Sequence, residues 1–157
     1  MTEAKILSLP ALILLRKQWA ANKQQVVFTN GCFDILHLGH VDYLEKARQK
    51  GQKLIVGLNS DASVKRLKGD TRPINEVYAR ARMLAALAFV DAVVVFEHDT
   101  PLELIQNLLP DVLVKGNDYS PENIVGAKEV IAAGGSVETI SLVDGYSTTN
   151  LVKKMSH

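Results

Sequence analysis

Residues 26–51 read VVFTNGCFDILHLGHVDYLEKARQKG, which joins an apolar run to a short turn and then to a helical pattern. The apolar run is short and rich in valine, which is typical of a buried β-strand. We expect the following helix to begin near His40 and to end at Gly51. A strand, a turn and a helix in this order predict the first part of a βαβ unit.

Five short runs of this kind alternate with longer helical patterns along the chain. They read QVVFTN (25–30), KLIVGLN (53–59), AVVVFE (92–97), VLVKG (112–116) and VETIS (137–141). Because these runs show little polar alternation, we expect strands that helices cover on both faces. The pattern predicts an α/β, Rossmann-like, three-layer fold with a central parallel sheet of about five strands.

Capping signals predict where several helices begin. Thr100, Pro101 and Glu103 match a capping box with proline at the first helical position, and Ser120 with Pro121 repeats the device. We read residues 58–73 as a loop that follows the second strand.

Composition bounds the classes of protein that the chain can represent. The sequence has 157 residues, 47% of them hydrophobic, which predicts a single domain over residues 1–157. Its 18 Lys and Arg against 17 Asp and Glu give no track for nucleic acid and no basic surface for a membrane. Residues 9–15, LPALILL, are too few to span a bilayer. The single cysteine fits a reducing compartment, so we expect a cytoplasmic protein.

The loops after the strands are the expected ligand site, because open parallel sheets bind ligands beyond the carboxyl ends of their strands. His37 and His40 lie three residues apart at the start of a helix and therefore share a face. Beside the positive end of that helix they predict a phosphate site. Packing alone is the alternative for a single histidine. Zinc binding is a second alternative, although the i, i+4 spacing of the usual zinc helix is absent.

The stretch TNGCFDILHLGH (29–40) resembles the G-x-F-D-x-x-H-x-G-H signature of the cytidylyltransferase-like nucleotidylyltransferases. Four further segments are similar to the adenylyltransferases of this family that make ADP-heptose from heptose 1-phosphate. They read VGLNSDASVKRLKG (56–69), RPIN (72–75), LPDVLVKGNDY (109–119) and GYSTTNLVKK (145–154). In some bacteria this activity is fused to a sugar kinase, whereas the present chain resembles the stand-alone form.

The resemblance implies a reaction in which a sugar 1-phosphate attacks the α-phosphorus of ATP and pyrophosphate leaves. It implies catalytic roles for His37, His40 and Lys68, with Lys65 as the other loop lysine that could reach the phosphates. Nucleotide or phosphate binding is implied for Thr29, Asn30, Gly31, Cys32, Phe33, Gly39, Arg80, Lys115, Gly116, Asp118, Tyr146, Ser147, Thr148 and Thr149. Acceptor binding is implied for Asp34, Asn59, Asp61, Lys65 and Arg72.

Mg²⁺ is the implied cofactor, held mainly by ATP phosphates and water, and we assign it no protein ligands. The expected partners are ATP, a small sugar phosphate and a second copy of the chain. A separate sugar kinase is a further expected partner. Two other functions stay open at this point. One is a CTP-dependent transferase acting on glycerol 3-phosphate or a similar polyol phosphate, and the other is a non-catalytic nucleotide-binding module.

Overall fold

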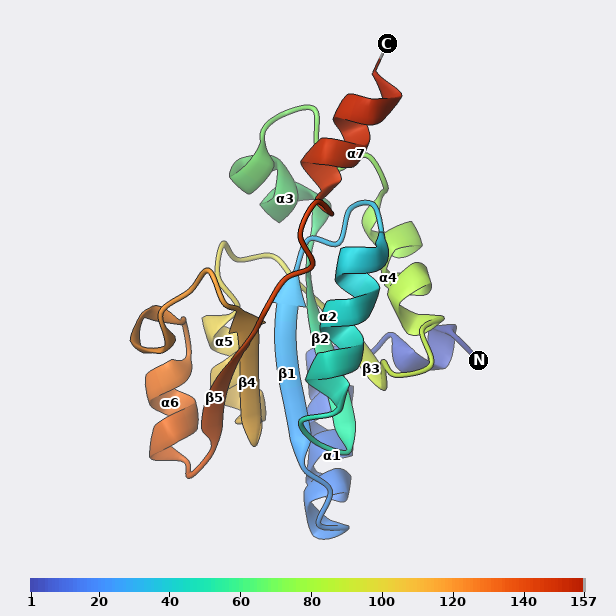
Figure 1. Cartoon of the computed structure of the whole chain (residues 1–157). Coiled ribbons are helices and arrows are strands. Elements are labelled where there is room, and N and C mark those ends of the chain that lie inside the picture. Colours follow the sequence, from blue (N-terminus) through green and yellow to red (C-terminus); the bar gives the residue numbers. More distant parts are fainter. Residues whose placement is uncertain (157) are drawn as a thin grey trace.

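A computed structural model describes residues 1–156, and a sheet of five parallel strands lies at its centre (Figure 1). The strands are β1 (Val26–Gly31), β2 (Lys53–Asn59), β3 (Ala92–Phe96), β4 (Val112–Gly116) and β5 (Ser136–Ile140). Their order across the sheet is β3-β2-β1-β4-β5. All five predicted strands are confirmed, each within one residue of its expected ends.

Helices cover both faces of the sheet, which confirms the three-layer prediction. The helices α2 (Leu38–Arg48) and α4 (Val77–Ala85) pack on one face, where Leu44 and Leu84 share a core cluster with Val27. The opposite face carries α1 (Leu9–Ala21), α5 (Leu102–Leu108) and α6 (Ala127–Ala132) around Phe28. Within residues 1–156, no helix combines the length and the apolar character that crossing a membrane requires.

Two further helices, α3 (Asp61–Lys68) and α7 (Thr148–Met155), lie beyond the carboxyl ends of the central strands (Figure 1). The prediction that residues 58–73 form only a loop was therefore wrong. The side chain of Ser60 accepts a hydrogen bond from the amide of Ser63 and caps α3, while Gly69 follows its last residue. Ser60 is a typical N-cap residue, but the polar residues that follow it are also typical of a loop.

Two predicted helix starts also differ in the structure. Pro101 occupies the N-cap position of α5, one place earlier than expected, and no side chain caps this helix. Ser120 and Pro121 open only a short 3-10 turn, η2 (Pro121–Asn123), and α6 begins after Gly126. Another 3-10 turn, η1 (Glu3–Lys5), precedes α1.

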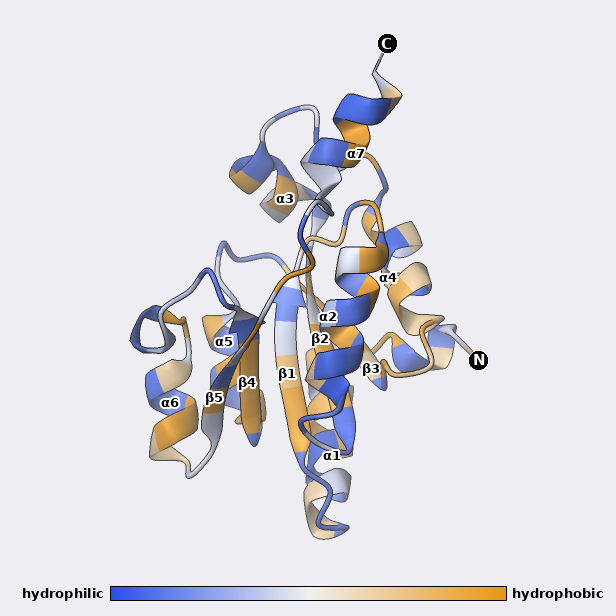
Figure 2. Ribbon diagram, viewed as in Figure 1, coloured by the Kyte–Doolittle hydropathy of each residue, from blue (hydrophilic) through white to orange (hydrophobic). Residues whose placement is uncertain are grey.

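The order of the strands reverses between β1 and β4, and the two strands separate there. Strand β1 pairs with β2 along its whole length but with β4 only at Val27–Val112 and Phe28–Leu113. Beyond these pairs the hydroxyl of Tyr43 joins the strands, at 2.7 Å from the hydroxyl oxygen of Thr29 and 3.2 Å from the carbonyl oxygen of Val114. Figure 2 shows that β1 starts hydrophobic and ends hydrophilic, at the edge where ligands bind in such sheets.

Candidate active site

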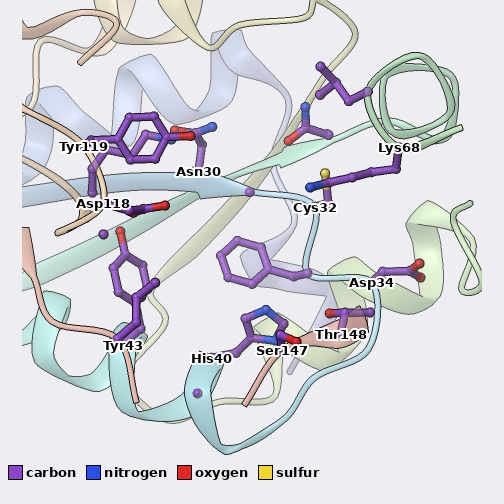
Figure 3. Close-up of a pocket in the computed structure, with 18 of the residues that line it drawn as sticks. Asn30, Cys32, Asp34, His40, Tyr43, Lys68, Asp118, Tyr119, Ser147 and Thr148 are labelled. Carbon is purple, nitrogen blue, oxygen red and sulfur yellow. The ribbon is translucent and has the colours of Figure 1, made fainter. Parts of the chain in front are cut away.

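A cavity of about 710 Å³ opens at the carboxyl ends of the strands, where their order reverses (Figure 3). It brings together most of the side chains that the sequence nominated. The nominated residues that line it are Asn30, Gly31, Cys32, Phe33, Asp34, His37, Gly39, His40, Asn59, Lys68, Arg72, Lys115, Gly116, Asp118, Tyr146, Ser147, Thr148 and Thr149.

Four nominated residues do not line the cavity. Thr29 is fully buried against Tyr43, and Arg80 is fully buried beneath the first loop. Asp61 binds Arg80, at 2.7 Å between Oδ1 and Nη2, and Lys65 is exposed on α3. The structure therefore separates Lys68, which reaches the cavity, from Lys65, which does not.

His37 and His40 form a stacked pair at the start of α2. Their ring centroids lie 3.8 Å apart with 23° between the ring planes, as their spacing along the helix predicts. His37 is the N-cap residue of α2, and its carbonyl oxygen accepts hydrogen bonds from the amides of His40 and Val41. Phe33 meets the ring of His40 edge-on, with 5.1 Å between the ring centroids. The pair is thus held between the helix start and the first loop.

Burial makes both imidazoles favour the neutral form. Burial, together with the neighbouring His37, lowers the pKa of His40 to about 4, and burial lowers the pKa of His37 as well. The Nδ1 atoms of both rings are buried and have no hydrogen-bond partner among residues 1–156. Buried ring nitrogens normally have partners, so this pair is prepared for groups that a ligand brings.

Gly39 leaves the space in which the pair fits. A Cβ atom at this position would lie 2.9 Å from Cε1 of His37 and 3.2 Å from Cβ of Tyr146. The first contact is closer than real Cβ atoms tolerate, so a side chain here would displace the ring. The glycine in the H-x-G-H motif thus serves the close approach of His37 and the loop that carries Tyr146.

Helix α7 begins on the other side of this loop. Ser147 is its N-cap residue, and its side-chain oxygen accepts the amide of Asn150 at 3.0 Å. Tyr146, Ser147, Thr148 and Thr149 all line the cavity, so the start of α7 and the start of α2 face the same space. The amides and hydroxyls at these two helix starts suit the oxygens of a polyphosphate.

The end of β4 supplies Lys115, Gly116 and Asp118. Burial lowers the pKa of Lys115, while the Asp118 carboxylate opposes that shift, and the Lys115 ammonium lies 5.5 Å from the ring centre of Tyr119. A Cβ atom at Gly116 would lie 2.7 Å from Oδ1 of Asp118, so this glycine allows the aspartate to fold back over the strand end.

Asp34 is directed toward the protein rather than toward open solvent. Its carboxylate is 1% exposed and accepts Nε–H of Arg72 at 2.5 Å and the amides of Ile74 and Asn75 at 2.9 Å. Burial alone would raise the pKa of Asp34, but the amides of Asn75 and Ile74, with Arg72, outweigh it and hold the pKa below its usual range. In Figure 3 the Asp34 carboxylate points away from His40.

Arg80 lies beneath the loop after β1, close to the same region of the cavity. Its guanidinium donates to the carbonyl oxygens of Cys32 at 2.8 Å, Asn59 at 2.8 Å and Asn75 at 2.9 Å. It therefore ties the first loop, the end of β2 and the segment before α4 to one buried cation. Arg80 therefore supports the segments that form the cavity but does not line the cavity itself.

Sequence reasoning missed several residues of the cavity. Tyr43 could have been found, because it follows His40 by three residues and shares its helix face. Thr100 and Asn123 lie in loops that follow strands, where the ligand site was expected, but nothing in their local pattern singled them out as ligand-binding residues. The other missed lining residues are Leu67, Asp99, Pro101, Tyr119, Ile124, Val125, Leu142 and Val143.

The residues at the cavity do not form a ready-made metal cage. Among residues 1–156, no three His, Cys, Asp or Glu side chains come together in a group that would hold a metal ion. The Asp118 carboxylate lines the cavity, whereas the Asp34 carboxylate is occupied by Arg72 and two amides. Mg²⁺ commonly binds through one or two carboxylates, water and substrate phosphates, and that mode fits Asp118.

Comparison with known proteins gives one family. The family described as Cytidylyltransferase-like matches residues 28–154. "Bifunctional protein HldE" of Geotalea uraniireducens is 55% identical over 154 residues, which is 98% of this chain and 31% of that protein. The protein of the same name from Haemophilus ducreyi is 60% identical over 132 residues, or 84% of this chain and 28% of that protein. The chain thus spans less than a third of these relatives.

Solved structures agree with this result. The lipopolysaccharide core biosynthesis protein from Thermoplasma volcanium is 26% identical, and the match covers 79% of this chain and 99% of that one with a TM-score of 0.61. Pantoate-beta-alanine ligase from Francisella tularensis has the same TM-score at 15% identity and covers 94% of this chain and 75% of that one. The second likeness concerns the fold alone.

Proposed function

Because this chain belongs to the cytidylyltransferase-like family, we propose that it transfers AMP from ATP to heptose 1-phosphate, giving ADP-heptose and pyrophosphate. The observation that carries the proposal is the stacked pair of His37 and His40, which faces the start of α7 across one cavity. The heptose is supported by the four sequence segments that resemble ADP-heptose-forming enzymes and by the HldE relatives.

The proposed reaction is a single displacement at phosphorus. A phosphate oxygen of the sugar attacks the α-phosphorus of ATP, and the bond from that phosphorus to the bridging oxygen of the β-phosphate breaks. Pyrophosphate leaves with the electron pair of that bond. Negative charge spreads over the phosphoryl oxygens in such a transition state, so donors placed in advance provide most of the acceleration.

The two histidines suit this task in their neutral form. Each neutral imidazole carries one N–H that can donate to a phosphoryl oxygen, and a nearby polyanion favours uptake of a proton from solvent, which adds a second donor and a positive charge. The side chains of Ser147, Thr148 and Thr149 would hold the β- and γ-phosphates at the start of α7. Pyrophosphate would thus leave into a site lined by hydroxyls and amides.

Cations on the other walls would balance the remaining charge. We assign Lys68 to the phosphates because it lines the cavity and Lys65 does not. Arg72 also lines the cavity, and its Nε–H is bound to Asp34, so the two terminal nitrogens of its guanidinium would be left for a ligand. A guanidinium fork matches two phosphate oxygens, so Arg72 is our candidate for the acceptor phosphate.

Mg²⁺ would accompany ATP in this cavity. Its chemistry is the neutralisation of the triphosphate and of the departing pyrophosphate. Asp118 is the residue of this chain that would help to hold it. The chain's own donors, from α2 and α7, would orient the phosphates around it.

The cellular setting follows from the same reaction. The consumption of ATP and a sugar phosphate favours the cytoplasm, and the product suits the synthesis of lipopolysaccharide core or another surface glycan. A sugar kinase activity would supply the acceptor. We also propose a homodimer, on the family resemblance alone.

Pyrophosphate release tests the proposed function. The purified protein is assayed with Mg²⁺ and with ATP or CTP, each combined with heptose 1-phosphate or glycerol 3-phosphate. Turnover only with ATP and the heptose supports the proposal. Turnover with CTP and glycerol 3-phosphate would agree with the roles of the phosphate-binding residues but refute the heptose assignment. No turnover in any combination would refute an enzyme acting on these substrates.

A further inference from the structure

Asn30 lies on the opposite side of β1 from the histidine pair. Side chains alternate along a strand, and Val26 and Phe28 belong to the core cluster beneath α1, α5 and α6. Asn30 continues their series, whereas Thr29 turns toward Tyr43 of α2. In Figure 3, Asn30 and His40 accordingly stand on opposite sides of the β1 ribbon.

The amide of Asn30 lacks a partner that it needs. Its Oδ1 atom is buried and has no hydrogen-bond partner among residues 1–156, although the residue lines the cavity. An amide oxygen accepts hydrogen bonds and cannot bind an ionised phosphate oxygen, which also only accepts. The missing partner is therefore a donor such as a hydroxyl or an amine.

Other uncharged polar groups of the cavity lie on the same side. Asn59 continues the series of Ile55 and Gly57 on β2, and Ile55 packs in the same cluster as Phe28. Thr100 precedes α5, and Asn123 precedes Ile124, whose side chain joins that cluster as well. We call Asn30, Asn59, Thr100 and Asn123 the amide-lined side of the cavity. All four line it.

The two sides of the cavity carry different chemical groups and therefore suit different parts of the substrates. The side of the histidines and α7 offers amides, hydroxyls and imidazoles to phosphate oxygens. The four named residues of the amide-lined side offer groups that donate and accept, which is what a chain of sugar hydroxyls requires because each hydroxyl does both. Lys115, which follows Leu113 of the same core cluster by two residues on β4, adds one cation on that side. A ligand that is an anion at one end and a polyol at the other would extend from the first side to the second.

We propose that the amide-lined side binds the hydroxyl groups of the acceptor sugar and that Asn30 is a specificity-determining residue for that acceptor, not a ligand of the nucleotide. This inference rests on the proposed function, since it takes a phosphorylated polyol as the acceptor. It reassigns Asn30, which the sequence analysis places with the nucleotide and phosphate ligands.

Asn30→Leu tests the inference, because leucine has a similar size and makes no hydrogen bond. We expect kcat/KM for heptose 1-phosphate at saturating ATP to fall about 10- to 100-fold, the range for leaving one or two polar groups unpaired. ATP binding measured by calorimetry without acceptor should change less than about twofold. Asn107→Leu, on the exposed face of α5, is the matched control and should change neither quantity.

Acceptors that lack single hydroxyls locate the contact. The analogue that lacks the hydroxyl bound by Asn30 should be a poor substrate of the wild type. Asn30→Leu should not lower the kcat/KM for this analogue further. A loss of ATP affinity equal to the loss for the acceptor, or an equal effect of the variant on every analogue, would overturn the inference. Asn30→Ala repeats the test if thermal unfolding shows that the leucine variant is not folded.

The activity of the wild-type protein distinguishes a failure of this inference from a failure of the proposed function. An inactive wild type in all four substrate combinations would overturn both. An active wild type whose acceptor kcat/KM is unchanged by Asn30→Leu would overturn only the role of Asn30.

Discussion

The carboxylate of Asp34 binds Nε–H of Arg72 at 2.5 Å, and this ion pair connects the loop after β1 to the segment before α4. Asp34 is almost fully buried, whereas the Arg72 side chain is 18% exposed and lines the cavity. The aspartate thus fixes one nitrogen of the guanidinium and leaves the terminal fork for a ligand. The structure thus connects Asp34 to the cavity through Arg72.

Asp34→Ala should therefore destabilise the protein and impair its use of the acceptor together. Removing one partner of a buried ion pair costs about 3 kcal/mol, because the other charge loses its compensation. Urea unfolding measures this loss. Asp42→Ala is the control, since Asp42 pairs with Lys46 on the surface of α2 and such pairs contribute less than about 1 kcal/mol. Equal stability of the two variants would contradict the role of Asp34.

Arg80 gives a second stability prediction. Its side chain is fully buried, and its bonds to Cys32, Asn59 and Asn75 would all be lost in Arg80→Met. We expect a loss of at least about 3 kcal/mol in the free energy of unfolding, because three buried carbonyl oxygens lose their donors.

Arg82→Met is the control for Arg80, since it changes the same residue type two positions along α4 where the side chain is 41% exposed. Its ion pair with Glu3 predicts a loss below about 1 kcal/mol. If Arg80→Met unfolds like the wild type and only the KM for ATP rises, Arg80 would be a phosphate ligand, as the family resemblance implies.

The sequence predicted what local patterns encode and missed what distant contacts decide. The five strands and the pairing of His37 with His40 follow from residue spacing, and the structure reproduces them. The partners of Asp34 lie 38 to 41 residues further along the chain, and Arg80 reaches a carbonyl oxygen 48 residues away. No periodicity reports such contacts, so the sequence could not show that a buried ion pair holds Asp34 or that Arg80 supports the first loop from inside the protein.

Gly39 separates stability from activity. Replacing glycine by alanine inside a helix normally stabilises it by about 1 kcal/mol. Here the added Cβ would lie 2.9 Å from His37 and 3.2 Å from Tyr146, so the ring of His37 must move. We expect Gly39→Ala to leave thermal unfolding within a few degrees of the wild type and to lower kcat about 10-fold or more. Unchanged kcat in a folded variant would show that the packing of the pair does not matter.

His40→Ala removes one donor from the pair. Loss of one well-placed donor to a developing anion typically lowers kcat about 10²- to 10³-fold. We expect this loss with little change in the midpoint of thermal unfolding. His98→Ala is the control, because the His98 side chain is exposed and lies 3.2 Å from the Glu103 carboxylate, away from the residues that line the cavity. A variant at His40 that loses stability and activity in parallel would indicate a packing histidine.

The low pKa of His40 makes the stability of the free protein depend on pH. In the unfolded chain the group titrates near its ordinary value of 6.5, but in the fold its pKa is about 4. Between these values the unfolded state binds more protons, so stability is fully present above about pH 6.5 and falls as the pH decreases toward 4. His40→Asn should flatten this part of the pH profile in urea unfolding, and His98→Asn should not.

ATP should reverse the shift, because a polyphosphate beside the imidazole stabilises its charged form. At about pH 5.5 the free protein holds His40 neutral, so ATP binding should take up protons. Calorimetry in buffers of different ionisation enthalpy measures this uptake. His40→Asn should reduce it, whereas His98→Asn should leave it unchanged because His98 lies outside the site. If the wild type binds ATP without taking up protons, the phosphates do not reach the histidine pair.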